Sequence, residues 1–187
     1  MGEPYTGVPV QFNAAVRSTD GGATWEGMVR LDSNPFPKIS GAQVRNWGGE
    51  TYFMQARGDG VVAVIRNTNS PTAWFTRSRD AGRSWSPLSR APFFACAAAT
   101  LTTASGVMLI AGRGDGTTVA ASWDDGTTWQ LFVIEAGTNG GNGAMHEVEP
   151  DVVLFVGQAW DVPQSPPHYF RLRVEHEPRA IRALSPQ

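Results

Sequence analysis

The hydrophobic residues of this 187-residue chain fall in short runs, which are separated by turns rich in glycine, proline and aspartate. β-Branched and aromatic residues are frequent in these runs, and no run keeps the 3.6-residue apolar period of an amphipathic helix. The chain also contains 21 glycines and 13 prolines, which is typical of a protein with many tight turns. We therefore expect an all-β fold with almost no helix.

The apolar runs group into units of four strands. A half unit comes first, with strands predicted at 12–17 and 26–31. Three complete units follow, with strands predicted at 50–57, 61–66, 72–77 and a fourth beginning at Trp85; at 97–103, 107–111, 117–122 and 130–134; and at 144–148, 152–156, 169–174 and 180–184. Because the strands within a unit are joined by short turns, we expect each unit to be an antiparallel sheet.

One octapeptide pattern, Ser-x-Asp-x-Gly-x-(Thr/Ser)-Trp, occurs three times, twice at the end of the third strand of a complete unit. One match would be weak evidence, but three matches in one chain are not chance. The defining residues are Ser18, Asp20, Gly22 and Trp25; Ser78, Asp80, Gly82 and Trp85; and Ser122, Asp124, Gly126 and Trp129.

These residue types suit a hairpin turn. The aspartate can accept hydrogen bonds from successive backbone N–H groups of a tight turn, and the glycine can adopt a positive φ without steric strain. The serine and threonine hydroxyls can tie the flanking strands together, and the tryptophan can cover the end of the core. We therefore expect a structural role for the octapeptides and no chemistry on a substrate.

Four-stranded antiparallel units that repeat at this spacing are typical of β-propeller blades. We predict a single partial propeller over 1–187, with about three and a half blades at 10–35, 48–92, 95–136 and 143–185. Propellers close with about four to eight blades. An open segment leaves the apolar flanks of its terminal blades uncovered, so self-association through these flanks is a further prediction.

Charge and composition limit the kinds of partner that this chain is expected to bind. The chain has 15 basic and 17 acidic side chains and a net charge of −2, which argues against nucleic acid or an anionic membrane as a partner. The residues after Met1 lack the pattern of a signal peptide, and no apolar run is long enough to span a membrane. We expect a soluble chain of undetermined compartment. The lone Cys96 excludes an internal disulfide framework, and no metal or other cofactor is predicted.

The octapeptides resemble the Asp box, or BNR repeat, of the sialidase (neuraminidase) superfamily, whose members have six-bladed propellers. The segment Glu50-Thr51-Tyr52 to Val64-Ile65-Arg66 is also similar to a sialidase segment in which two apolar strands flank an Asp-Gly turn. The resemblance implies that Glu50 supports a catalytic tyrosine and that Arg66 binds the substrate carboxylate. It also implies that Arg113 corresponds to the third of the family's three carboxylate-binding arginines, and that the ligand is a glycan or another anionic small molecule.

The chain departs from the sialidase pattern where the nucleophilic tyrosine would stand. No tyrosine lies in 143–147, and Tyr5, Tyr52 and Tyr169 are not in matching contexts. His146-Glu147 is a weaker candidate for this position. A further arginine and the acid/base aspartate of the family belong to blades that would precede this chain.

Two hypotheses follow for the function. The chain is either the C-terminal portion of an exo-α-sialidase-like glycoside hydrolase, with little or no activity alone, or a non-catalytic propeller that binds carbohydrate or protein. At the level of single residues, ordinary surface roles for Glu50, Arg66 and Arg113 are the alternatives.

Overall fold

The computed structural model describes residues 13–31, 48–67, 72–93, 98–114, 116–135, 140–159 and 167–184. Within these segments all regular secondary structure is β-strand, which confirms the all-β prediction. Cys96 and Tyr5 lie outside the described residues. No helix in the described segments could cross a lipid bilayer.

The strands form three four-stranded antiparallel sheets and one two-stranded sheet, in which consecutive strands are neighbours. We call them blades 1 to 4 in chain order. Blade 1 contains β1 (Ala14–Ala15) and β2 (Val29–Arg30); blade 2 contains β3 (Gly48–Gln55), β4 (Val61–Asn67), β5 (Trp74–Ser78) and β6 (Ser89–Arg90); blade 3 contains β7 (Ala99–Thr102), β8 (Met108–Gly114), β9 (Gly116–Ser122) and β10 (Gln130–Glu135); and blade 4 contains β11 (Gly140–Glu149), β12 (Val152–Ala159), β13 (His168–His176) and β14 (Arg179–Leu184).

The fourth strand of blade 2 is shorter than the sequence predicts. The prediction started it at Trp85, but β6 contains only Ser89–Arg90. Ser86 N still donates to Arg77 O at 2.8 Å. Pro87 comes next, and because proline has no backbone N–H, the ladder of hydrogen bonds cannot continue through it. In blade 4 the opposite occurs, since β11 extends beyond the predicted 144–148 and contains two register shifts.

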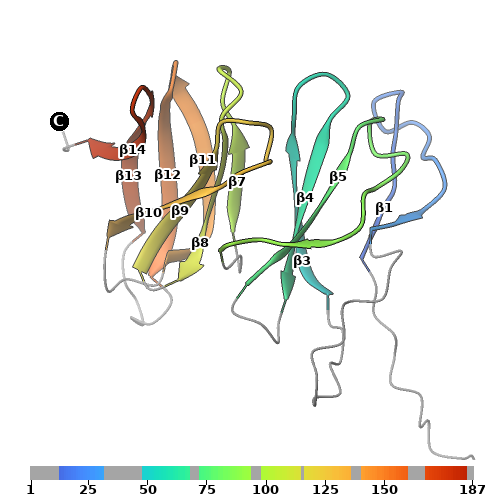
Figure 1. Cartoon of the computed structure of the whole chain (residues 1–187), viewed down its shortest axis with the longest axis horizontal. Coiled ribbons are helices and arrows are strands. Elements are labelled where there is room, and N and C mark those ends of the chain that lie inside the picture. Colours follow the sequence, from blue (N-terminus) through green and yellow to red (C-terminus); the bar gives the residue numbers. More distant parts are fainter. Residues whose placement is uncertain are drawn as a thin grey trace, which may run out of the picture.

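The core lies between the blades, because the central strands are buried on both faces. In β4, Val62 and Val64 pack with residues of blade 3 such as Met108, whereas Ala63 and Ile65 pack toward Leu31, which directly follows β2 of blade 1. A third cluster joins blades 3 and 4. Alternate side chains on one strand thus contribute to two different clusters. The blades therefore lie side by side in chain order, as in a propeller segment (Figure 1).

The strand directions define two ends of the blades. The three octapeptide loops and the hairpin turns at 57–60, 104–106 and 150–151 lie at one end, which we call the octapeptide end. The start of β3 and the end of β4, which carry Glu50 and Arg66, lie at the other, which we call the opposite end. The predicted structural residues and the predicted ligand-binding residues are therefore separated by the length of a blade.

Candidate functional site

The three octapeptide loops form the same hydrogen-bond network. In loop 3 (Ser122–Trp129), Ser122 Oγ donates to Asp124 Oδ1 at 2.8 Å and accepts from Gly126 N at 2.8 Å. Asp124 also accepts from Thr128 N at 2.8 Å and from Thr128 Oγ1 at 2.6 Å. Loop 1 (Ser18–Trp25) and loop 2 (Ser78–Trp85) repeat these contacts. Each aspartate thus receives two hydroxyl groups and the N–H of the residue four positions on, and the N–H groups of Arg83 and Thr127 add to this at Asp80 and Asp124, in line with the successive N–H bonds that the sequence suggests.

These hydrogen bonds stabilise the ionised aspartates. Bonds from the Thr24 side chain and backbone, followed by Ser18, lower the pKa of Asp20 to about 2. The corresponding bonds from Ser84 and Ser78 hold the pKa of Asp80 well below its usual value. Burial acts to raise the pKa of Asp124, but the bonds from Thr128 and Ser122 lower it overall.

We expect the stability of the fold to fall in acid. A carboxyl whose pKa is lower in the folded than in the unfolded state stabilises the fold above its unfolded pKa of about 4, and this contribution is lost as the pH falls toward the folded value. Urea midpoints should therefore decrease from pH 4 to pH 2. The Asp80→Asn variant should have a lower midpoint at pH 6 and a shallower acid dependence. Equal midpoints for the wild-type protein at pH 5 and pH 2 would contradict this role of the aspartates.

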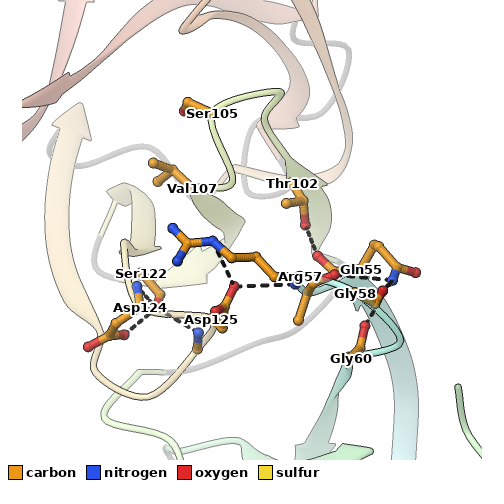
Figure 2. A network of polar contacts seen from close by, with 12 residues as sticks. Gln55, Arg57, Gly58, Gly60, Thr102, Ser105, Val107, Ser122, Asp124 and Asp125 are labelled. Carbon is orange, nitrogen blue, oxygen red and sulfur yellow. Dashed lines mark hydrogen bonds and ion pairs between the residues drawn. The ribbon is translucent and has the colours of Figure 1, made fainter. Parts of the chain in front are cut away.

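Loop 3 also contacts the neighbouring blade 2. Arg57 N donates to Asp125 Oδ1 at 3.4 Å, and Arg57 Nε lies 3.9 Å from the same oxygen; the two side chains point toward each other from adjacent blades (Figure 2). Arg77, on β5, donates to Gly126 O. A shallow cavity of about 270 Å³ lies between these groups and is lined also by Arg79 and Asp124. The Arg57–Asp125 ion pair and the bond from Arg77 to Gly126 O both cross from one blade to the other, which indicates a blade-to-blade connection.

Blades 3 and 4 are joined at the octapeptide end by a different network, because blade 4 has no octapeptide. Glu147 accepts from Ala104 N at 2.7 Å and from Asp151 N at 2.9 Å. Asp151 accepts from Ser105 Oγ at 2.6 Å and lies 3.1 Å from His176 Nε2. Glu147 is therefore occupied by two backbone amides, far from the opposite end. The suggestion that His146-Glu147 takes the place of the tyrosine is wrong for Glu147.

The opposite end brings two of the predicted site residues together. Arg66 Nη1 lies 2.7 Å and 3.0 Å from the two carboxylate oxygens of Glu50, and both side chains are partly exposed. The Arg66 stem lies over Gly49, where an added Cβ would be 3.1 Å from Arg66 Cδ. Arg66 Nε is buried and has no hydrogen-bond partner among the described residues. The guanidinium is thus held in place by its packing and by Glu50.

A second contact supports this arrangement from blade 1. Asn13 Nδ2 donates to Gly49 O at 3.0 Å and to Thr51 Oγ1 at 2.6 Å. These bonds hold the start of β3, on which Glu50 lies, against the preceding blade. The position of the Glu50–Arg66 pair therefore depends on the contact between blades 1 and 2.

Arg113 lies at the same end of the neighbouring blade. Its backbone is part of β8 and pairs with Thr117 of β9; its side chain is outside the described part of the structure, so its orientation toward Arg66 stays a prediction. Of the tyrosines, Tyr52 has a structural contact, since its hydroxyl accepts from Ala98 N at 3.0 Å. Among the described residues, no group of three or more His, Cys, Asp or Glu side chains is placed to hold a metal ion.

Sequence reasoning missed the arginines that connect the octapeptide loops to their neighbours. Arg17 and Arg77 each stand directly before the first serine of an octapeptide. Arg77 donates to Gly126 O of the next blade, and Arg17 Cδ lies 3.9 Å from where a Cβ on Gly82 would be. The recurring Arg-Ser pair was a signal for this role, but it could be interpreted only once the partner of each arginine was known.

The blades resemble those of known glycosidases. No protein-family model and no curated protein matches the sequence. Among solved structures, a Hadza microbial sialidase has a TM-score of 0.63 and 21% identity, over 84% of this chain and 37% of that chain. The NanB sialidase from Streptococcus pneumoniae has a TM-score of 0.60 and 17% identity, over 79% of this chain and 24% of that one.

A third neighbour is a GH43 glycoside hydrolase with an engineered active site. It has a TM-score of 0.52 and 12% identity, over 84% of this chain and 34% of its own. At these identities the likeness shows the fold, which is a segment of a β-propeller of the kind found in glycosidases. This chain spans well under half the length of each of these three structures.

Proposed function

We propose that this chain is a sialidase-like propeller segment that binds an anionic sugar at the opposite end of its blades. The Glu50–Arg66 pair carries the proposal, because a guanidinium that is held by its packing and by a carboxylate is prepared to bind a second carboxylate. A planar guanidinium can hold a carboxylate with two parallel hydrogen bonds. The fold of the two sialidase neighbours supports the same class of ligand.

Charge explains why Arg66 alone would bind weakly. Glu50 lies 2.7 Å from Arg66 Nη1, so the pair has almost no net charge. An anionic ligand therefore needs an additional cation, and Arg113, at the same end of blade 3, is the candidate within this chain. We propose that Arg66 and Arg113 bind the ligand together and that Glu50 positions Arg66.

We also propose that this chain alone has little or no hydrolytic activity. Sialidases use a tyrosine as the nucleophile, and no tyrosine stands in 143–147. Glu147 in this segment is bonded to two backbone amides of the turns at the octapeptide end. The candidate site thus contains groups that bind an anion and lacks an assigned nucleophile.

The second candidate function is a non-catalytic module that binds carbohydrate or protein, and the missing tyrosine favours it. No hydrolysis by the isolated chain is expected under both hypotheses. The two hypotheses predict different results for a longer chain that includes further blades. Hydrolysis of a sialoside by that chain would favour the enzyme, and no hydrolysis would favour the non-catalytic module.

The Arg66→Ala variant should lose most of the binding of N-acetylneuraminic acid. Because a charge-assisted hydrogen bond contributes about 1.5–3 kcal/mol, we expect affinity to fall by roughly 10- to 100-fold. Saturation-transfer NMR titrations would measure it. Arg182→Ala is a matched control, since Arg182 is also an arginine paired with a glutamate, at 2.8 Å from Glu175, but lies on β14.

A fluorogenic sialoside assay tests the catalytic part separately. We expect no turnover by the wild-type chain above the background rate. Turnover that disappears in Arg66→Ala would contradict the proposed incompleteness while supporting the site, whereas binding that is unchanged by Arg66→Ala would contradict the site itself.

A further inference from the structure

The three octapeptide loops differ in what covers their tryptophans. Trp129 packs into the cluster between blades 2 and 3, and Trp85 packs into the cluster that includes Leu31. Trp25, the corresponding residue of loop 1, is 63% exposed. Two of the three loops thus have a neighbouring blade on their tryptophan side, and loop 1 has none within the described chain.

Other apolar side chains extend this exposed flank of blade 1. Val16 is 56% exposed and Met28 is 60% exposed. Ala15 pairs with Val29 and packs toward blade 2, so the next residues, Val16 and Met28, face the other way. Together with Trp25 they form an apolar surface, which we call the N-flank. Apolar surface of this kind is typical of an interface.

The covered loops show what an octapeptide loop packs against. Loop 3 lies on blade 2, where an added Cβ on Gly126 would be 3.1 Å from Val62 Cγ2. The ring of Trp129 meets Phe93 edge to face, with centroids 5.1 Å apart, and Arg77 donates to Gly126 O. The receiving face thus combines apolar side chains with an arginine that binds the carbonyl of the loop glycine.

The last blade carries a similar face on its outer side. Val153 and Phe155 pack toward blade 3, so the alternate residues Val152 and Val156 point away from it. Their partners across the strand pair are Arg173 and Tyr169. Val152 is buried, whereas Val156 is 38% exposed, Tyr169 is 68% exposed, and Arg173 is exposed as well. We call this surface the C-flank.

The two faces also share the order of their residues along the strand. In blade 2, Arg77 pairs with Val62 near the octapeptide end, and Phe75 pairs with Val64 farther along. In blade 4, Arg173 pairs with Val152 near that end, and Tyr169 pairs with Val156 farther along. Arg171 lies between them on the C-flank and is paired with Glu149. Both faces therefore have an arginine near the octapeptide end and an aromatic residue farther along, but the aromatic residue is two positions from the arginine in blade 2 and four positions from it in blade 4.

We propose that the N-flank of one copy of this chain docks on the C-flank of a second copy. Trp25 would pack against Val156 and Tyr169, and Arg173 would donate to Gly22 O as Arg77 does to Gly126 O. The second copy is the occupant because each molecule carries both complementary halves, and because the interface repeats one that already exists between blades 2 and 3. Such a head-to-tail contact uses different surfaces on the two copies.

Sedimentation velocity over a range of concentrations tests this contact with the full chain. We expect concentration-dependent association of the wild-type protein, weakened at least tenfold by Trp25→Ser and by Arg173→Glu. Val133→Ser is the control, because Val133 is equally exposed, at 61%, but lies on β10 away from both flanks. Circular dichroism at low concentration should show the same fold for all variants, since each substituted side chain is exposed.

An equimolar mixture of the two defective variants gives a sharper result. The Trp25→Ser copy keeps its C-flank and the Arg173→Glu copy keeps its N-flank, so the mixture should associate more strongly than either variant alone. A wild-type protein that stays monomeric at all concentrations would overturn the proposal. Association that survives Trp25→Ser, or that the mixture fails to restore, would overturn it as well.

Discussion

Replacing Phe155 with alanine is expected to destabilise the protein by about 3–5 kcal/mol, because a large buried ring is lost and a cavity remains. Phe155 is 2% exposed and lies in the cluster that joins blades 3 and 4. Its ring is stacked with Phe170 at a centroid distance of 6.3 Å. Single domains have a total stability of about 5–15 kcal/mol, so this substitution removes a large share of it.

The surroundings of Phe155 explain why the cavity would stay open. The ring lies over two glycines, and an added Cβ would be 2.5 Å from it at Gly143 and 2.8 Å from it at Gly157. These residues have no side chains that could move into the space. Urea unfolding at low protein concentration would measure the loss. Val133→Ala is the control and should change stability by less than about 0.5 kcal/mol, as exposed sites do; a similar small loss for Phe155→Ala would contradict the packing described.

The second large effect is expected for Gly126→Ala in octapeptide loop 3. Gly126 has a φ of +74°, and an alanine in this region costs about 1–2 kcal/mol. Its Cβ would also approach Val62 Cγ2 at 3.1 Å and Met108 Sδ at 3.5 Å, both in the core between blades 2 and 3. Overpacking of such a site adds about 1–3 kcal/mol. We therefore expect a total loss of about 2–5 kcal/mol in a urea titration.

Gly22→Ala separates the two contributions. Gly22 is the corresponding residue of loop 1, with a φ of +93°, but an added Cβ would meet only Trp25 Cζ2 at 3.8 Å. It should therefore show the backbone contribution without the packing contribution. Equal losses for Gly22→Ala and Gly126→Ala would mean that loop 3 does not press on blade 2.

Much of the fold could be predicted because its signals are local. The strand pairs of blades 2 to 4 follow the apolar runs, and the octapeptides predict turns because serine, aspartate and glycine satisfy one another within a few residues. The strand bounds that the sequence predicted wrongly also have local causes. Pro87 delayed the outer strand of blade 2 until Ser89, and the register shifts of β11 are not visible in a pattern of alternating residues.

The candidate site was predictable only in part. The sequence indicated Glu50 and Arg66 through a resemblance, but their pairing depends on β3 and β4 being neighbours and on the space above Gly49. The role of Arg113 stays a prediction. The structural use of Glu147 could not be foreseen, since Ala104, one of its two partners, belongs to another blade.

The sequence by itself determined the strands, the octapeptide turns and the repetition of the blades, because each depends on residues that are close together in the chain. Only the tertiary structure decided which octapeptide loops are covered by a neighbouring blade and which arginines bind other residues. Trp25 and Trp129 occupy the same position in the same motif, yet one is exposed and the other is packed. The difference lies in whether a neighbouring blade, distant in the sequence, supplies the apolar surface that removes the indole from water.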